Sequence, residues 1–285
     1  MREVAARDGQ PVIGCALASL TAQRLQQASG IPSSSLAWLL ARLEAGQSLQ
    51  PRSLVVVDEA GMVGTRDLTL LFEDAQRAGG RVLLVGDPEQ LPEIDAGGFF
   101  RHLSQPEARP AQLRGNQRQR YCWEAGALEQ LRANRPVIAL GEYVRNDRLT
   151  LSPDRDAMYE RISTDYLHAT AASSGPEQHR QVVVLATRRS DVDQLNHTIR
   201  LALQATGRLG PDQLHSPETG TGYAVGDEVI VVVQCRDADG RKVLNGTRGH
   251  VTSADPSGLS LQPDQGPASR SRPRPSRRPS STATR

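Results

Sequence analysis

The sequence predicts an α/β protein with a parallel sheet flanked by helices. Two apolar runs, Leu54–Val57 and Arg81–Val85, have the length and the valine and leucine content of buried parallel strands. The stretch Thr65–Arg77 between them has helical spacing. Strand, helix and strand in this order form a crossover unit, which places both strands in one sheet with their carboxyl ends at the same edge.

The residues before the first of these runs continue the alternation. Pro11–Leu17 has the length of a short buried strand. A helix is expected at Ala22–Ala28, before a glycine and a proline that would end it. Ser33–Ser35 offers an N-cap to a second helix, Leu36–Ala45.

The rest of the first domain is predicted to be mostly helical. Apolar patterns indicate helices at Phe99–Leu103, Tyr121–Ala133 and Val137–Gly141, and a strand at Ala111–Leu113. The second half begins as α/β, with helices expected at Ala157–Ala172 and Ser190–Gln204 and a β-branched strand, Gln181–Ala186, between them. It ends in short strands with turn sequences of the Asp-Gly and Asn-Gly kind, expected at Tyr223–Gln234, Lys242–Leu244 and Gly249–Ser253.

These patterns divide the chain into four parts. The polar stretch Asn146–Asp154, which contains Pro153, is the predicted domain boundary. We expect a first domain at 1–146, the start of a second at 155–222 and a small antiparallel β module at 223–262. The Arg/Pro/Ser-rich tail at 263–285 buries too little apolar surface to order itself and is expected to be disordered.

Composition sets limits on the function. Hydrophobic residues make up 38% and charged residues 23% of the 285, which is an ordinary balance for a soluble protein. Residues 266–285 hold six arginines and no acid, so subtracting six from the net charge of +2 leaves −4 for residues 1–265. Nucleic-acid binding would therefore need a local basic groove. Three scattered cysteines and the lack of a signal-like or membrane-spanning stretch predict a cytoplasmic protein with reduced thiols and no membrane partner.

The two predicted strands end in acidic turns, and these are the best candidates for a functional site. Asp58 and Glu59 follow the first strand, as in a Walker B site, where the aspartate holds magnesium and the glutamate orients or deprotonates the attacking water. The second turn, Gly86–Leu91, carries Asp87 and Gln90, and Gln90 would sense a γ-phosphate. A lone Asp-Glu pair is more often a simple strand end. Two such turns at one edge favour a nucleoside triphosphate and its magnesium.

These turns resemble motifs of a known family. Asp58–Val63, with Gly86–Pro92 and Ala96–Gly98, is similar to motifs II and III of superfamily 1 DNA helicases of the RecD-like branch, above all the helicase domains of conjugative relaxases of the TraA and TrwC type. Weaker likenesses follow in the family's order: Gly14–Ser19 and Ala28–Ser33 (motif Ia), Arg118-Gln119 (motif IV), Val183–Arg200 (start of a second RecA-like domain) and Val243–Val251 (a small inserted barrel).

The resemblance implies a fold, ligands and residue roles. The fold would be a RecA-like parallel sheet, then part of a second RecA-like domain with a small β-barrel module, and the ligands would be ATP, Mg²⁺ and single-stranded DNA. Asp58, Glu59, Asp87, Gln90 and Arg118 would bind nucleotide, with Asp58 as metal ligand, Glu59 and Gln90 in catalysis and Arg118 as arginine finger. Ser19, Thr187 and Arg188 would contact the DNA backbone. The alternatives are a solvated arginine at a helix start for Arg118 and simple caps for Ser19 and Thr187.

The chain also departs from the family. No G-x-x-x-x-G-K-[ST] loop, which would cradle the β and γ phosphates, occurs in the sequence, and the family's later motifs are replaced by the Arg/Pro/Ser tail. We therefore expect an internal piece of an ATP-dependent DNA helicase or translocase, inactive alone, whose loop would come from a longer chain, a relaxase domain or another partner. The alternatives are a nucleotide-incompetent DNA-binding or interaction remnant and an unrelated ATPase.

Overall fold

The computed structural model describes residues 8–91, 97–113, 118–171, 182–216, 220–256, 258–264 and 269–271. The chain divides into two units, Met1–Leu149 and Thr150–Arg285, and the change falls inside the polar stretch expected to be a boundary. Pro92 and Ala96, which the resemblance to motif III includes, lie outside the described residues, as do Ala172 and Gln181.

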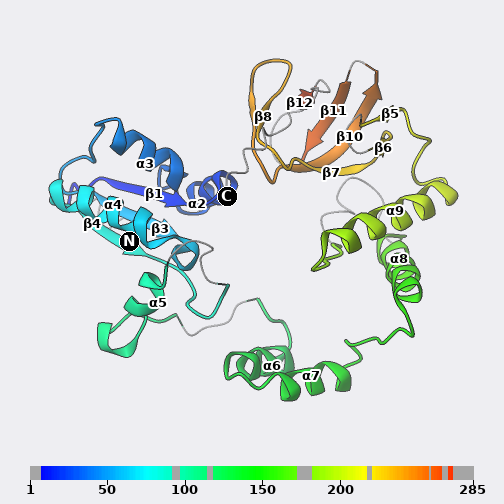
Figure 1. The fold of residues 1–285 in the computed structure, drawn as a ribbon, viewed down its shortest axis with the longest axis horizontal. Helices are drawn as coiled ribbons and strands as arrows, with labels where there is room; N and C mark the ends of the chain where they lie inside the picture. The colour runs from blue at the N-terminus through cyan, green and yellow to red at the C-terminus, as the bar shows by residue number, and fades with distance from the viewer. Residues whose placement is uncertain are drawn as a thin grey trace, which may run out of the picture. The chain divides into compact units, whose positions relative to one another are not determined.

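Unit 1 is built on a parallel sheet, so the predicted α/β class is confirmed (Figure 1). In the described residues its strand order is β2-β1-β3-β4, where these strands are Ser33–Ser35, Val12–Ala16, Leu54–Asp58 and Arg81–Leu84. Every neighbouring pair is parallel. The strand β2 was not predicted, because three serines carry no apolar pattern. They pair through the backbone, with Ser34 beside Cys15 of β1.

Helices cover both faces of this sheet. They are α2 (Ser19–Ser29), α3 (Leu36–Glu44) and α4 (Thr65–Arg77), and all three were predicted. The side chain of Ser35 caps α3 by accepting a hydrogen bond from the Trp38 amide at 3.3 Å, as expected. The apolar faces of α3 and α4 pack on alternate residues of β3, and Leu68, Leu71 and Val57 are fully buried there. The helix α2 packs on the other face, where its Leu25 lies against Gly14.

The remainder of unit 1 is helical. Its elements are η1 (Ala60–Met62), α5 (Phe99–Leu103), η2 (Pro106–Ala108), α6 (Cys122–Arg132) and α7 (Pro136–Arg145), and α6 and α7 lie side by side in Figure 1. The expected strand Ala111–Leu113 was wrong, because these residues form no regular element. Leu113 is fully exposed there, so no packing supports a strand.

In unit 2 two helices pack together: α8 (Arg155–Ala171) and α9 (Arg189–Ala205). Both agree with the predicted helices to within two residues. The Tyr159 hydroxyl on α8 donates a hydrogen bond to the Asp191 carboxylate on α9 at 2.9 Å. The strand expected at Gln181–Ala186 was wrong for its described residues, because 182–186 form no strand. Leu185 is 85% exposed, which shows that no neighbour packs against this side of the run.

The β module of unit 2 is antiparallel, as predicted. In the described residues its larger sheet has the order β12-β11-β10-β7, and two hairpins, β5-β6 and β8-β9, accompany it. The strands are β5 (Leu214–His215), β6 (Gly222–Tyr223), β7 (Glu228–Ile230), β8 (Cys235–Arg236), β9 (Lys242–Val243), β10 (Arg248–Asp255), β11 (Gly258–Pro263) and β12 (Ser269–Ser271). The strand β12 lies in the tail expected to be disordered. It pairs with β11, and backbone pairing needs no apolar side chain.

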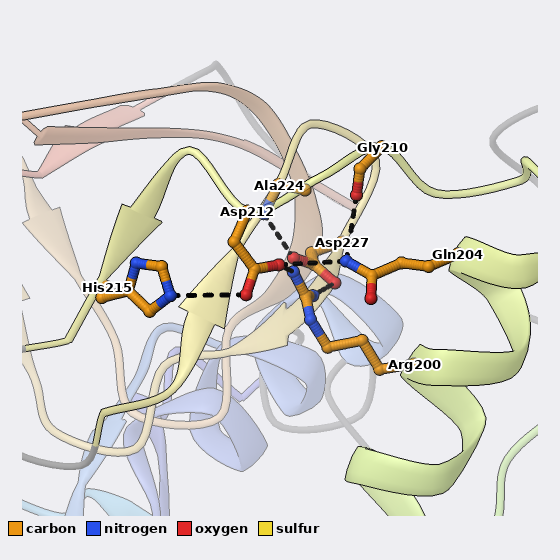
Figure 2. Close-up of polar contacts among 7 residues, drawn as sticks. All are labelled: Arg200, Gln204, Gly210, Asp212, His215, Ala224 and Asp227. Carbon is orange, nitrogen blue, oxygen red and sulfur yellow. Dashed lines mark hydrogen bonds and ion pairs between the residues drawn. The ribbon is translucent and has the colours of Figure 1, made fainter.

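A charge cluster ties α9 to the β module (Figure 2). The guanidinium of Arg200 on α9 donates hydrogen bonds to the carboxylates of both Asp212 and Asp227. Gln204, one turn along the helix, donates to Asp212 at 3.1 Å, and Asp227 accepts from the Ala224 amide at 2.6 Å. Charged groups therefore carry much of this connection. No helix in the described part of the chain is long and apolar enough to cross a bilayer.

Candidate functional site

The two acidic turns touch each other at one edge of the unit 1 sheet, as the crossover predicted. The amide of Val85 donates to the carbonyl of Val57 at 2.8 Å, and the amide of Ala60 donates to the carbonyl of Val85 at 2.9 Å. A β-carbon on Gly86 would lie only 3.1 and 3.2 Å from the backbone nitrogens of Gly61 and Ala60 and 3.1 Å from the ring of Phe100, which is tighter than an ordinary contact. Gly86 thus favours the close approach that puts Asp58 and Asp87 on one edge.

Asp58 and Glu59 sit on a tight, strained turn. Asp58 ends β3 and is half-buried, and its Oδ1 accepts a hydrogen bond from the Glu59 amide at 3.1 Å. In the part of the chain that the structure describes, its Oδ2 has no hydrogen-bond partner, so this oxygen remains for a cation. Glu59 has φ 54° and ψ 41°, a left-handed conformation that is unfavourable for a residue with a side chain. Strain of this kind is concentrated at functional sites.

Asp87 shapes the second turn and binds a residue that the sequence analysis missed. Its Oδ1 accepts from the Glu89 amide at 3.0 Å, and its Oδ2 accepts from Nη2 of Arg132 at 2.6 Å. Arg132 is the last residue of α6, 45 positions away in the sequence. No local pattern links two residues so far apart, so this contact could not have been predicted. The carboxylate of Asp87 therefore holds the turn, and its contact with a nucleotide stays a prediction.

Gln90 and Arg118 are exposed. The amide of Gln90 donates to the carbonyl of Asp87 at 3.3 Å, so the turn holds its backbone and its side chain faces solvent. Arg118 lies four residues before α6. None of the contacts described above for Asp58, Glu59 and Asp87 involves Arg118, and its role as an arginine finger stays a prediction.

The three residues predicted to contact DNA lie in both units. Ser19 is the first residue of α2, which follows β1, and Ala16 at the end of β1 is in register with Asp58. Ser19 is therefore at the same sheet edge as the acidic turns. Thr187 and Arg188 are exposed in unit 2, just before α9. The carbonyl of Arg188 accepts hydrogen bonds from the amides of Asp191 and Val192, both at 3.1 Å, and its side chain makes no capping hydrogen bond to α9.

The residues of the acidic edge fit magnesium only as part of a site. Within the described ranges, no three His, Cys, Asp or Glu side chains gather as a metal-binding group. Magnesium bound to a nucleotide needs only one or two carboxylates, because phosphates and waters supply the other ligands. Asp58 meets that need. Cys15, in register with Val57, is not a candidate nucleophile, because burial raises the pKa of its thiol to about 12.

Comparison with known proteins gives three kinds of match. Residues 1–154 match the family model described as "AAA domain". The conjugal transfer protein TraA of Rhizobium radiobacter is 32% identical over 248 residues, which are 86% of this chain and 22% of TraA. The ATP-dependent RecD2 DNA helicase of Deinococcus radiodurans is 40% identical over 88 residues, 29% of this chain and 12% of that protein. The chain thus spans about a fifth of the TraA relatives it matches.

Among solved structures, the Pif1 helicase from Bacteroides in complex with ADP-AlF3 and ssDNA matches 94% of this chain and 66% of its own, with a TM-score of 0.49 and 15% identity.

Proposed function

We propose that this chain, which belongs to the AAA domain family and is related to superfamily 1 helicases of the RecD-like branch, is part of an ATP-dependent DNA helicase or translocase core. The observation that carries the proposal is the contact between the Asp58 and Asp87 turns at the carboxyl edge of a parallel sheet. Ligands of open α/β sheets bind at that edge. Conjugal transfer, which the TraA relatives are named for, is a process in which such a motor would act.

The acidic edge would divide the chemistry of ATP hydrolysis among four residues. Asp58 would hold Mg²⁺ through its unpartnered oxygen, directly or through water, and Glu59 would orient or deprotonate the attacking water. Gln90 would contact the γ-phosphate. Asp87 would contribute by holding the turn that carries Gln90, because its own carboxylate is bound by Glu89 and Arg132. Mg²⁺, when bound, compensates the charge of the transferred phosphoryl group, and Arg118 would add to this from outside the turns.

Single-stranded DNA is the proposed partner. The relative RecD2 is by its name a DNA helicase, and Ser19, Thr187 and Arg188 stand at helix starts, where hydroxyls and amides can meet phosphates. Arg188 is exposed, so its guanidinium can neutralise a phosphate without losing a protein partner. The DNA would have to be bound by local contacts, since residues 1–265 are acidic overall.

The proposed nucleotide site lacks, within these 285 residues, the positively charged loop that would bind the phosphates. Phosphate-binding loops of this family place a lysine on the β and γ phosphates. The only lysine of the sequence is Lys242, which lies in β9 of unit 2 and follows Arg241 rather than a glycine. A longer chain, a relaxase domain or another partner would have to supply the loop. The second candidate function is a nucleotide-incompetent DNA-binding or interaction remnant.

Turnover and nucleotide binding separate the two candidates. We expect the isolated chain to hydrolyse ATP at background rate with or without single-stranded DNA, because the triphosphate charge is largely uncompensated. DNA-stimulated turnover that is lost in Asp58→Ala would show instead that the site is complete. Binding of a fluorescent ATP analogue is the finer test. A motor core should bind it weakly and more tightly with Mg²⁺, and Asp58→Ala should abolish the Mg²⁺ effect, whereas a remnant should show no Mg²⁺ effect at all.

DNA binding is tested with a labelled single-stranded oligonucleotide by fluorescence anisotropy. Arg188→Ala should weaken binding about 3–10-fold and flatten its salt dependence, as expected for one lost phosphate contact. Arg161→Ala is the matched control, because Arg161 is an exposed arginine of the same unit that pairs with Asp165 on α8. Equal effects of the two substitutions, or no binding by the native chain, would contradict the assignment of Arg188.

A further inference from the structure

The second acidic turn is tied to the rest of unit 1 by one side chain. Within the turn, the carbonyl of Asp87 accepts a hydrogen bond from the Gln90 amide at 3.3 Å, and its Oδ1 accepts from the Glu89 amide at 3.0 Å. In the described part of the chain, the hydrogen bond from Nη2 of Arg132 to Oδ2 of Asp87, at 2.6 Å, is the one that reaches residues 87–91 from outside the turn. The orientation of the turn therefore depends on Arg132.

Arg132 extends from a well-supported helix end. It is the last residue of α6, and α6 packs on α7. Ala127 of α6 and Ala139 of α7 are buried, and the rings of Trp123 and Tyr143 meet edge to face at 5.4 Å. The packed helix pair gives the guanidinium a fixed base. An exposed ion pair of this kind contributes little to the stability of a fold, so we expect it to matter for the position of the turn.

The two carboxylate oxygens of Asp87 have different tasks. Oδ1 shapes the turn locally through the Glu89 amide, whereas Oδ2 fixes the turn to α6 through Arg132. Gln90 is on the same turn and its side chain is exposed. A hydrogen bond from this side chain to a ligand requires a separation of about 3 Å, and a displacement of about 1 Å is enough to lose it. The contact of Oδ2 with Arg132 therefore controls where Gln90 can reach.

We propose that Arg132 is a positioning residue that holds the turn of Gln90 through Asp87 and so gives the site a preference for a nucleoside triphosphate over a diphosphate. The inference rests on the proposed function, in which Gln90 contacts the γ-phosphate. Only a triphosphate carries that group, so loss of the Arg132 contact should weaken triphosphate binding and leave diphosphate binding unchanged. A general loss of structure would weaken the binding of both. Arg132 acts through Asp87 and needs no contact with the nucleotide.

The affinities of the full chain for fluorescent ATP and ADP analogues, both with Mg²⁺, test the proposal. The native chain should bind the ATP analogue about 10-fold more tightly, and Arg132→Ala should bring this ratio to about one, as expected for one lost hydrogen bond to a charged group. Asp87→Asn should do the same, because its amide oxygen still accepts from Glu89 whereas its NH₂ group cannot accept from Arg132. Arg145→Ala is the matched control and should keep the native ratio, because Arg145 is the exposed last residue of α7 and pairs with Glu142.

A spin label reports the turn without any nucleotide. It is attached through Leu91→Cys, at a side chain that is 81% exposed, in a chain whose Cys122 and Cys235 are replaced by serine. Electron paramagnetic resonance should show a restrained label that becomes more mobile in Arg132→Ala. Equal mobility in the two chains, or a native ratio of ATP to ADP affinity in Arg132→Ala, would overturn the inference and leave the proposed function standing. A native chain that binds neither analogue would overturn both.

Discussion

The interactions that connect the elements within unit 1 differ from those that connect α9 to the β module within unit 2. In unit 1, a continuous apolar core runs from Cys15 through β3 to the buried faces of α3 and α4. In unit 2, the connection between α9 and the β module passes through Arg200 and two carboxylates, shown in Figure 2. Apolar packing depends less on salt and pH than charged pairs do. Unit 2 also buries apolar side chains such as Leu195, Val251 and Leu261, so its charged connection is the part expected to respond most to salt and pH.

Backbone strain follows the same division. Among the described residues, the non-glycine positions with left-handed backbone are Arg52, Glu59, Arg109, Asn134 and Asp147, and all lie in unit 1. A strained conformation persists only where the surroundings determine it. The core of unit 1 supplies that support to Glu59, because Ala60 and Val57 on either side of the Asp58-Glu59 pair are fully buried.

Removing a core side chain should have the largest effect, and it should be confined to unit 1. Leu71→Ala leaves a cavity under the sheet at a fully buried site, so we expect a loss of about 3 kcal/mol in the free energy of unfolding. Both tryptophans, Trp38 and Trp123, are in unit 1, so urea unfolding followed by tryptophan fluorescence reports this unit alone.

Thiol labelling gives an independent readout of the same change. Cys15 is fully buried and its thiol has a raised pKa, so it should react with iodoacetamide only when unit 1 opens. Leu71→Ala should accelerate its labelling about 100-fold, which corresponds to the expected loss of stability. Leu201→Ala is the control, because Leu201 is 52% exposed on α9 in unit 2. If Leu71→Ala and Leu201→Ala shifted the urea unfolding curve followed by tryptophan fluorescence by similar amounts, the two units would not unfold separately.

Breaking the Arg200 cluster should have the next largest effect, and in the other unit. Arg200→Ala leaves two carboxylates without their cation, and the Arg200 side chain is only 17% exposed, so we expect a loss of about 2 kcal/mol in unit 2. Circular dichroism should show the loss while tryptophan fluorescence stays unchanged. Arg161→Ala removes an exposed pair on α8 and should cost less than about 0.5 kcal/mol. Equal losses in the two variants would mean that the cluster does not hold the unit.

The same cluster predicts an acid-sensitive unit 2. The hydrogen bond from Arg200 lowers the pKa of the Asp212 carboxyl below its usual 3.8. A lowered pKa in the folded state contributes stability above the unfolded value, and this contribution is lost as the pH falls from 3.8 through the folded pKa. Melting of unit 2 by circular dichroism should shift to lower temperature in that window. In Arg200→Ala the melting temperature of unit 2 should fall less over the same pH window. If it fell as much as in the native chain, the ion pair of Asp212 with Arg200 would not be the cause of the pH dependence.

The predictable part of this molecule is the part that apolar periodicity determines. The strands β1, β3 and β4 and the helices between them are visible in the sequence because valines and leucines recur at strand or helix spacing. The meeting of Asp58 and Asp87 follows from the crossover rule alone. Strands without that pattern, such as β2 and β12, were missed because backbone pairing leaves no side-chain signal. At Val182–Ala186 the error was the reverse, because a strand was predicted and none forms. Residues with high β propensity make a strand only where neighbours pack on them.

The smallest expected effect is a gain in stability at Glu59, which tests whether the core of unit 1 really offsets strain at the acidic edge. Left-handed backbone costs a residue with a side chain about 1–2 kcal/mol, and glycine avoids this cost but raises the entropy of the unfolded chain by about 0.4–1 kcal/mol. Glu59→Gly should therefore stabilise unit 1 by about 0.5 kcal/mol in tryptophan-monitored urea unfolding. Glu59→Ala keeps the β-carbon and should gain nothing, and Arg52→Gly, at another left-handed position, should gain as much as Glu59→Gly. If Glu59→Gly destabilised unit 1 while Arg52→Gly stabilised it, the Glu59 side chain would hold the turn together, and the strain would not mark a position kept for chemistry.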